Sequence, residues 1–222
     1  MTSQKDGGHL KPMPRDQQNA LLPRFAKDAI LTERKRKQIV EGACRLFFKK
    51  GYHGTTIREI ASAAGMSLGQ LYHYISSKDD ILFLVYRHMQ ELWRQHLVET
   101  GIDRGHDPIE KLKKALRETT AFMAKNKKLL LFIYTESKYL DQRHLKAVLE
   151  MDDEEVVGFW RRILIGANEG GEIKGDINLL ANIISYLMVF FPMRGWNVKE
   201  IPFEETANRL TEFILMGLGL QA

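Results

Sequence analysis

Two helix-start signals lie on either side of Gly65 and strongly limit how this part of the chain can fold. Thr56 with Glu59, and Ser67 with Gln70, are capping boxes, in which a hydroxyl and a side chain three residues later cap a helix N-terminus. Gly65 suits the left-handed conformation that often ends a helix. The pattern predicts two short helices joined by a tight turn, the helix-turn-helix arrangement. In that motif the second helix lies in the major groove of DNA.

The second helix carries side chains suited to DNA contact. Leu71 is its only large apolar residue at a core-facing position, so the others are left for the outside. Gln70 can pair with adenine, and His73 can donate or accept at a base edge. Tyrosine hydroxyls and the cation of Lys78 suit phosphate oxygens. The candidate DNA contacts are Arg34, Thr55, Thr56, Ser67, Leu68, Gly69, Gln70, Tyr72, His73, Tyr74 and Lys78. On these residues alone, an ordinary helical hairpin with a polar surface is the alternative.

This stretch resembles the DNA-binding signature of the TetR (tetracycline-repressor) family of transcriptional regulators. The resemblance rests on TIREIA from Thr56, AGMS from Ala64, GQLYHY from Gly69 and SK from Ser77. It covers residues 34–83, while the rest of the chain matches only in length and helical pattern. Ile75 stands where the family usually has Phe, and we expect only a repacking there. The resemblance implies a dimeric repressor that responds to a ligand.

Excess positive charge is confined to the part of the chain that holds this motif. The chain of 222 residues has a net charge of +5. Residues 1–80 contain 14 Lys and Arg against 8 Asp and Glu, and the remainder contains 19 against 20. This distribution predicts a polyanionic partner for the N-terminal part, which a merely soluble basic surface would not.

The sequence predicts a cytoplasmic protein without an internal disulfide framework. Cys44 is its single cysteine and lies in an apolar run, which favours a buried structural thiol over a redox sensor. The N-terminus begins with polar residues, so we expect no signal peptide. The longest apolar stretch, residues 179–193, is shorter than the roughly 20 residues that span a bilayer, and we expect no membrane partner.

Hydrophobic periodicity predicts an all-α fold with three parts. Residues 1–30 are polar with Gly and Pro, so we expect a flexible basic arm, a simple tail rather than a minor-groove contact. Residues 31–78 should form a three-helix helix-turn-helix domain, whose first helix runs from Thr32 to Lys50. Residues 79–222 should form a larger helical domain for effector binding and dimerisation. Helices are expected there over residues 78–100, 107–126, 127–139, 145–168, 179–191 and from 202 onward.

The last two predicted helices are very apolar for the end of a chain. We therefore expect their exposed faces to pack against a second copy in a four-helix homodimer interface. A two-fold dimer would present two reading helices to one face of a palindromic double-stranded DNA operator. Its half-sites should lie about 34–36 Å apart or somewhat more.

The family resemblance implies an effector pocket among the helices after residue 107. Its Met-rich and aromatic composition suits a small effector that is apolar or acyl. The stretch from Glu136 to Arg143 loosely resembles regulators of fatty-acid degradation, which implies an acyl chain as its CoA thioester, with Lys138 or Arg143 near the phosphates. Aromatic degradation products and drug-like compounds are alternatives. The candidate contacts, each also explicable as core, are Met123, Phe132, Tyr134, Met151, Phe159, Trp160, Tyr186, Phe190 and Met193.

We expect no catalytic site, metal site or cofactor. The 7 histidines show no metal-ligand spacing, and no nucleophile elbow, phosphate loop or dinucleotide fingerprint is present. The acidic run from Asp152 to Glu155 could hold a hard metal ion, but adjacent residues point in different directions around a helix, which favours a solvated face. We therefore favour a DNA-binding transcriptional repressor. The alternatives are a sequence-insensitive architectural DNA-binding protein, an enzyme with an incidental hairpin and a non-DNA interaction module.

Overall fold

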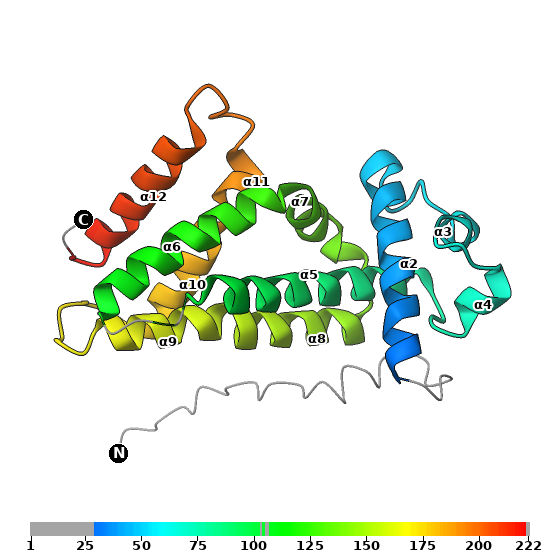
Figure 1. Ribbon diagram of the computed structural model, residues 1–222, viewed down its shortest axis with the longest axis horizontal. Helices are drawn as coiled ribbons and strands as arrows, with labels where there is room; N and C mark the ends of the chain where they lie inside the picture. The colour runs from blue at the N-terminus through cyan, green and yellow to red at the C-terminus, as the bar shows by residue number, and fades with distance from the viewer. Residues whose placement is uncertain (1–28, 103, 105–106, 221–222) are drawn as a thin grey trace, which may run out of the picture.

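The computed structural model describes residues 29–102, 104 and 107–220 (Figure 1). These residues form helices joined by loops, without a β-strand, which confirms the all-α prediction. The predicted flexible arm, residues 1–30, lies outside the described residues except for its last two positions, which begin the first described helix.

The helix-turn-helix forms where the two capping boxes predict it. Helix α2 (Ala29–Lys50) packs against α3 (Ile57–Ala63), and α4 (Leu68–Tyr72) follows after the turn. In both capping boxes the hydroxyl accepts a hydrogen bond from the backbone N–H three residues later. Gly65 has a φ of 67°, the left-handed conformation expected of it. Helix α2 begins at Ala29, before the predicted Thr32.

The long helix α5 (Lys78–Thr100) connects this unit to the rest of the molecule. Ser77 caps its start in a third capping box with Asp80, and Gly101 ends it with a φ of 53°. Helix α5 contacts α2 and also α8 (Gln142–Asp152), beside which it runs in Figure 1. One continuous helix is therefore shared by the helix-turn-helix and the larger helical part.

The larger part packs its helices around α5 and α6 into one apolar core. Trp160, Leu112 and Leu116 are among its fully buried side chains. None of the helices in the described part of the chain combines the length and apolar character that crossing a membrane would need. The elements are α6 (Pro108–Lys125), α7 (Lys127–Glu136), the 3-10 turn η1 (Ser137–Tyr139), α8, the π-helical turn η2 (Asp153–Val157), α9 (Gly158–Ala167), α10 (Ile177–Met188), α11 (Phe190–Arg194) and α12 (Phe203–Gly217).

Two helices differ from their predicted bounds for local reasons. The helix predicted over residues 145–168 begins earlier, because the Asp141 carboxylate accepts from the His144 N–H and caps it. The helix predicted over residues 179–191 is divided between α10 and α11. Pro192 lacks the N–H that would bond the carbonyl four residues before it, so the continuous ladder is interrupted there.

Candidate functional site

The exposed face of α4 begins at its capping box. Leu71 is fully buried and anchors the helix, while Gln70, Tyr72 and His73 are exposed. The Ser67 N–H donates to the side-chain oxygen of Gln70 at 2.9 Å. The amide NH₂ of Gln70 can therefore donate to a base while the cap stays closed, whereas bidentate pairing with adenine requires the oxygen as well.

The remaining candidates on and beside α4 divide into two groups. Ser67 and Gly69 are exposed, and a Cβ built at Gly69 meets only the Ser67 hydroxyl oxygen, at 4.0 Å. Leu68 and Tyr74 are half-buried and pack against the core. Small exposed residues at the helix start leave room for a close approach by a large partner.

Thr55 and Thr56 have different surroundings, although both were predicted to meet phosphate. Thr55 is 1% exposed, and its hydroxyl donates to the Gly51 carbonyl at 2.9 Å. This burial excludes Thr55 from a phosphate contact and corrects the prediction. Thr56 is exposed, with its hydroxyl 2.9 Å from Glu59 Oε2 in the capping box.

Lys78 lies at the corner between α4 and α5. Its Nζ donates to the Tyr52 carbonyl and lies 4.2 Å from the centre of the Tyr52 ring. The Tyr52 hydroxyl in turn donates to Asp79 Oδ1 at 2.5 Å. Desolvation lowers the pKa of Lys78 from its ordinary value, while Asp79 and Glu59 act in the opposite direction. Lys78 therefore fixes this corner, and an ammonium group has three protons, so it can also donate to a phosphate.

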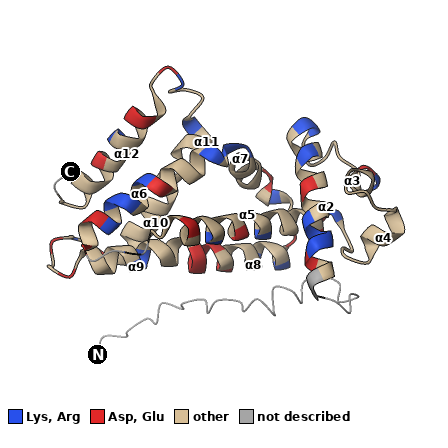
Figure 2. Cartoon of the chain, in the orientation of Figure 1, with Lys and Arg blue, Asp and Glu red and all other residues tan. Residues whose placement is uncertain are grey.

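Basic residues for a DNA backbone come from α2 rather than from α4. Figure 2 shows several Lys and Arg positions along α2, whereas the residues of α4 are all uncharged. Arg34 is exposed on α2. Arg36 is buried, and desolvation lowers the pKa of its guanidinium. The basic run at the start of α2 is therefore only partly available to a polyanion.

A cavity of about 350 Å³ lies in the larger helical part. It is bordered by α5, α6, α7, α8, η2 and α10, and apolar side chains dominate its lining. Its polar lining groups include the tyrosines of α5, α7 and α10 and one aspartate at the end of α8. A concave, mainly apolar cavity with a few polar groups is the usual form of a small-molecule site.

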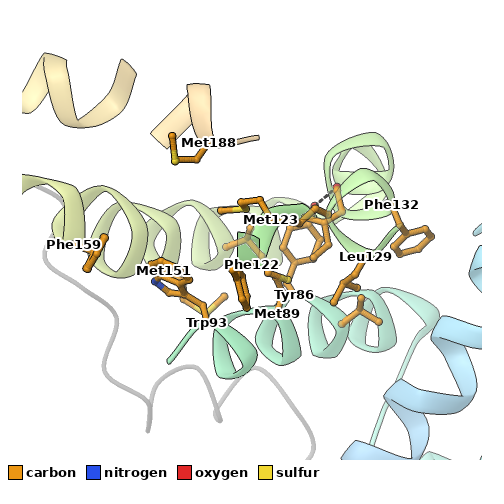
Figure 3. Packing of buried hydrophobic residues seen from close by; sticks show 14 of the residues in the cluster. Tyr86, Met89, Trp93, Phe122, Met123, Leu129, Phe132, Met151, Phe159 and Met188 are labelled. Atoms are coloured by element: carbon orange, nitrogen blue, oxygen red, sulfur yellow. Dashed lines mark hydrogen bonds between the residues drawn. The ribbon is translucent and has the colours of Figure 1, made fainter. Parts of the chain in front are cut away.

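Three of the predicted effector contacts line this cavity, namely Met123, Tyr134 and Tyr186. Phe132 instead stacks on Phe47 of α2 with ring centroids 5.0 Å apart, and Figure 3 shows it apart from the group around Met123. The remaining five lie outside the lining as well. Met151, Phe159 and Trp160 are buried core residues, Phe190 packs against Phe191, and Met193 is exposed.

The contribution of α5 to the cavity was missed from the sequence, where this helix was interpreted only as a connector. Tyr86, Met89, Gln90 and Trp93 line the cavity. Their spacing of three, four and seven residues places them on one face of the helix, so helical periodicity could have identified them. Figure 3 shows Tyr86, Met89 and Trp93 along α5, and the Tyr86 hydroxyl donates to the Ile133 carbonyl at 2.6 Å.

The acidic run after Met151 does not act as one surface. Asp152 lines the cavity, whereas Asp153 and Glu155 pair with Arg161 and Arg94. Desolvation, with a smaller contribution from Asp153, raises the pKa of Asp152 to about 6. Within the described residues, no group of three or more His, Cys, Asp or Glu side chains is placed to hold a metal ion.

An exposed apolar surface runs over α10 and α12, which we call the C-terminal apolar face. It includes Tyr186 at 72% and Met216 at 71% exposure. The other members of this face are Leu179, Ile183 and Phe213. Large exposed apolar side chains of this kind are often covered by another protein chain.

Comparison with known proteins gives matches over both parts of the chain. The family model for bacterial regulatory proteins of the tetR family matches residues 39–85, and the tetracyclin repressor-like C-terminal domain model matches residues 105–191. The HTH-type transcriptional regulator HbdR of Aromatoleum sp. (strain CIB) is 30% identical over 87% of this chain and 81% of its own length.

Two solved structures share the fold. FadR of Bacillus subtilis in complex with stearoyl-CoA has a TM-score of 0.68 and 22% identity, covering 82% of this chain and 98% of its own. AibR in complex with isovaleryl coenzyme A and operator DNA has a TM-score of 0.65 and 21% identity, covering 81% of this chain and 97% of its own.

Proposed function

Because the chain belongs to the TetR family of bacterial regulatory proteins, we propose that it is a homodimeric transcriptional repressor that a small, largely apolar effector releases from its operator. Each protomer would place α4 in the major groove of one half-site. Arg34, Thr56, Tyr72 and Lys78 would meet phosphate, and the amide of Gln70 would meet a base. Ser67, Leu68, Gly69, His73 and Tyr74 complete the proposed DNA-contact surface.

This proposal is supported chiefly by the positions of two exposed surfaces, α4 and the C-terminal apolar face. The capped helix α4 lies at one end of the molecule and α12 at the other, as Figure 1 shows. A two-fold axis through the C-terminal apolar face would join two copies at that end and leave both α4 helices free. Two reading helices at a fixed spacing recognise a palindromic site.

The cavity supports the effector part of the proposal. Tyr134, Met123 and Tyr186 would contact the effector, together with Trp93 of α5. An acyl group suits the apolar lining, and the fold-sharing FadR and AibR structures hold stearoyl-CoA and isovaleryl coenzyme A. Lys138 is exposed on η1, with its Nζ 5.0 Å from the centre of the Tyr139 ring.

A change at the cavity can reach α4 through α5 and α8. Both helices line the cavity, and both meet at the corner where α5 begins. An effector that binds more tightly to a dimer with misplaced reading helices would shift the population towards that state and weaken operator binding.

Native mass spectrometry of the purified chain tests the proposal. We expect a dimer that binds a palindromic duplex and retains a small molecule from the expression host. Adding that molecule, once identified, should release the duplex. A monomer that binds no duplex from its own promoter region would contradict the proposal.

A further inference from the structure

Asp152 stands out among the residues that line the cavity. The ionisable side chains of the lining are Tyr86, Tyr134, Tyr186 and Asp152, and none of the described lining residues is Lys, Arg or His. Within the described residues, the Asp152 carboxylate has neither a hydrogen bond nor an ion pair. The Asp152 side chain is exposed to solvent, although the protein atoms around it are close enough to raise its pKa. A ligand that enters the cavity would therefore replace water at this carboxylate, which favours a hydrogen-bond donor or a cation.

The backbone geometry sets this carboxylate apart from its acidic neighbours. Asp152 is the last residue of α8, and the π-helical turn η2 follows directly, with Val156 and Val157 also in the lining. Such π-helical turns are rare and frequently occur at functional sites. Asp153 and Glu155 reach arginines while Asp152 reaches the cavity, because neighbouring residues point in different directions around a helix.

Tyrosine hydroxyls surround the same part of the cavity. Desolvation raises the pKa of Tyr134 to about 12, and Asp152 and Tyr186 add to this shift through their charges. Desolvation also raises the pKa of Tyr86, with smaller contributions that include Tyr134 and Asp152. These phenols therefore stay protonated at neutral pH. The Tyr86 proton is donated to the Ile133 carbonyl, which leaves the Tyr86 oxygen as an acceptor, whereas Tyr134 can both donate and accept. The polar end of the cavity thus holds hydroxyls and one carboxylate, with no cation to receive an anionic group.

We propose that Asp152 makes the cavity selective for apolar molecules that carry a hydrogen-bond donor, a hydroxyl or an ammonium group, on the part seated in the cavity. This inference rests on the proposed function and specifies its effector. The donor would bind the Asp152 carboxylate, and the hydrocarbon or ring would contact Trp93 and the aliphatic lining. A terminal carboxylate at this position would be repelled. An acyl effector would accordingly carry a hydroxyl on the acyl part, rather than a plain chain.

Three probes with the same chain and different head groups test this selectivity in the full-length protein. Octanol, octylamine and octanoate are titrated by isothermal calorimetry, with intrinsic tryptophan fluorescence, to which Trp93 of the lining contributes, as a second readout. At about pH 8 we expect octanol and octylamine to bind about tenfold more tightly than octanoate, because hydrogen bonds to charged groups are strong. Comparison of octanol with octylamine distinguishes a neutral from a cationic donor.

Two variants test whether the Asp152 carboxylate causes the weaker binding of octanoate. In Asp152→Asn, octanol and octylamine should bind less than about threefold more tightly than octanoate. The negative charge that repels octanoate and attracts the donors is removed in this variant. Glu154→Gln, which loses the same charge from an exposed residue outside the lining, should keep the preference for octanol and octylamine over octanoate. Thermal unfolding of both variants verifies that they are folded.

The preference for octylamine should also fall between about pH 8 and about pH 5, because Asp152 gains its proton in that range. The groups that face it are Tyr86 of α5, Tyr134 of α7, Tyr186 of α10 and Asp153 of η2, and the two tyrosines with raised pKa values do not ionise there.

Tighter binding of octanoate, an unchanged preference in Asp152→Asn, or no binding of any probe would each overturn this inference. Operator release is measured separately. Head-group selectivity without any effect on DNA would contradict the proposed function and leave the role of Asp152 standing.

Discussion

His144 Nε2 lies 3.4 Å from Asp80 Oδ1, and both side chains are buried where α8 meets the start of α5. The other oxygen of Asp80 accepts from the N–H groups of Ser76, at 2.6 Å, and Ser77, at 3.3 Å. The same α8 lines the cavity farther along, from Leu145 to its last residue. This pair therefore connects a cavity-lining helix to the corner that follows α4.

Replacing Asp80 should destabilise the protein measurably. We expect Asp80→Ala to lower the free energy of unfolding by about 2 kcal/mol, because capping N–H groups lose their acceptor and His144 loses its neighbour. Urea denaturation followed by circular dichroism measures the change. Glu204→Ala is the control, since Glu204 is exposed in the first turn of α12 and caps nothing. Equal losses in the two variants would show that Asp80 does not stabilise this corner.

Gln70 allows the capping and base-reading roles to be separated. Gln70→Glu keeps a side-chain oxygen for the Ser67 N–H but removes the amide donor. We expect both Gln70→Glu and Gln70→Ala to reduce the difference in binding free energy between operator and random DNA by about 1–3 kcal/mol, which lowers the ratio of the two affinities. Tyr72→Ala should weaken both DNAs alike, because a phosphate contact carries no sequence information. Fluorescence anisotropy with the two duplexes gives the ratios, and an unchanged ratio in Gln70→Glu would exclude base reading by the amide.

If the C-terminal apolar face forms the dimer interface, a charged residue introduced there should separate the protomers. Met216→Glu should produce a monomer, since an interface core does not accommodate an unpaired charge. Val98→Glu changes an equally exposed residue, also at 71%, on α5 outside that face, and should leave the dimer intact. Sedimentation equilibrium distinguishes the two states. A dimeric Met216→Glu would place the interface elsewhere.

The stability of the free protein should depend on Asp152 in a defined pH window. Asp152 is exposed, yet the protein atoms around it raise its folded pKa from 3.8 to about 6. Ionisation is therefore less favourable in the folded than in the unfolded chain, and stability falls modestly as pH rises through this range. Asp152→Asn should therefore raise the Tm at about pH 8, and the gain should vanish at about pH 4, where the aspartate is neutral as well. Differential scanning fluorimetry at both pH values is sufficient. An equal gain in Tm at both pH values would mean that the charge of Asp152 does not cause the stability difference.

Cys44 should be slow to react in the native protein. Desolvation raises the pKa of its thiol to about 12, Arg45 opposes the shift and Glu41 adds to it. We expect alkylation by iodoacetamide at neutral pH to be about a hundredfold or more slower than in urea, because the thiolate is the reactive form. Mass spectrometry follows the reaction. Similar rates in both solvents would point to an accessible, reactive thiol.

Local signals predicted the helix starts well. Thr56, Ser67 and Ser77 cap their helices through side chains only three residues away, so the information lies within a few positions of sequence. The same locality explains why Gly65 could be assigned to the turn.

The cavity could not be predicted residue by residue, because its lining depends on how helices pack. Phe132 and Tyr134 are two positions apart on one apolar helix, yet the first stacks on α2 and the second lines the cavity. Asp152 was missed for a related reason. Its run of four acidic residues predicted a solvated face, and Asp152 is exposed, but the cavity that it lines depends on the packing of other helices.

Competition between two duplexes shows whether this protein recognises a DNA sequence. A palindromic duplex from the promoter neighbourhood of this chain is titrated against a shuffled duplex of the same composition, at several salt concentrations. We expect the palindrome to bind at least about a thousandfold more tightly and both affinities to fall steeply with salt. Equal affinity for the two duplexes would contradict this expectation and indicate an architectural DNA-binding protein instead.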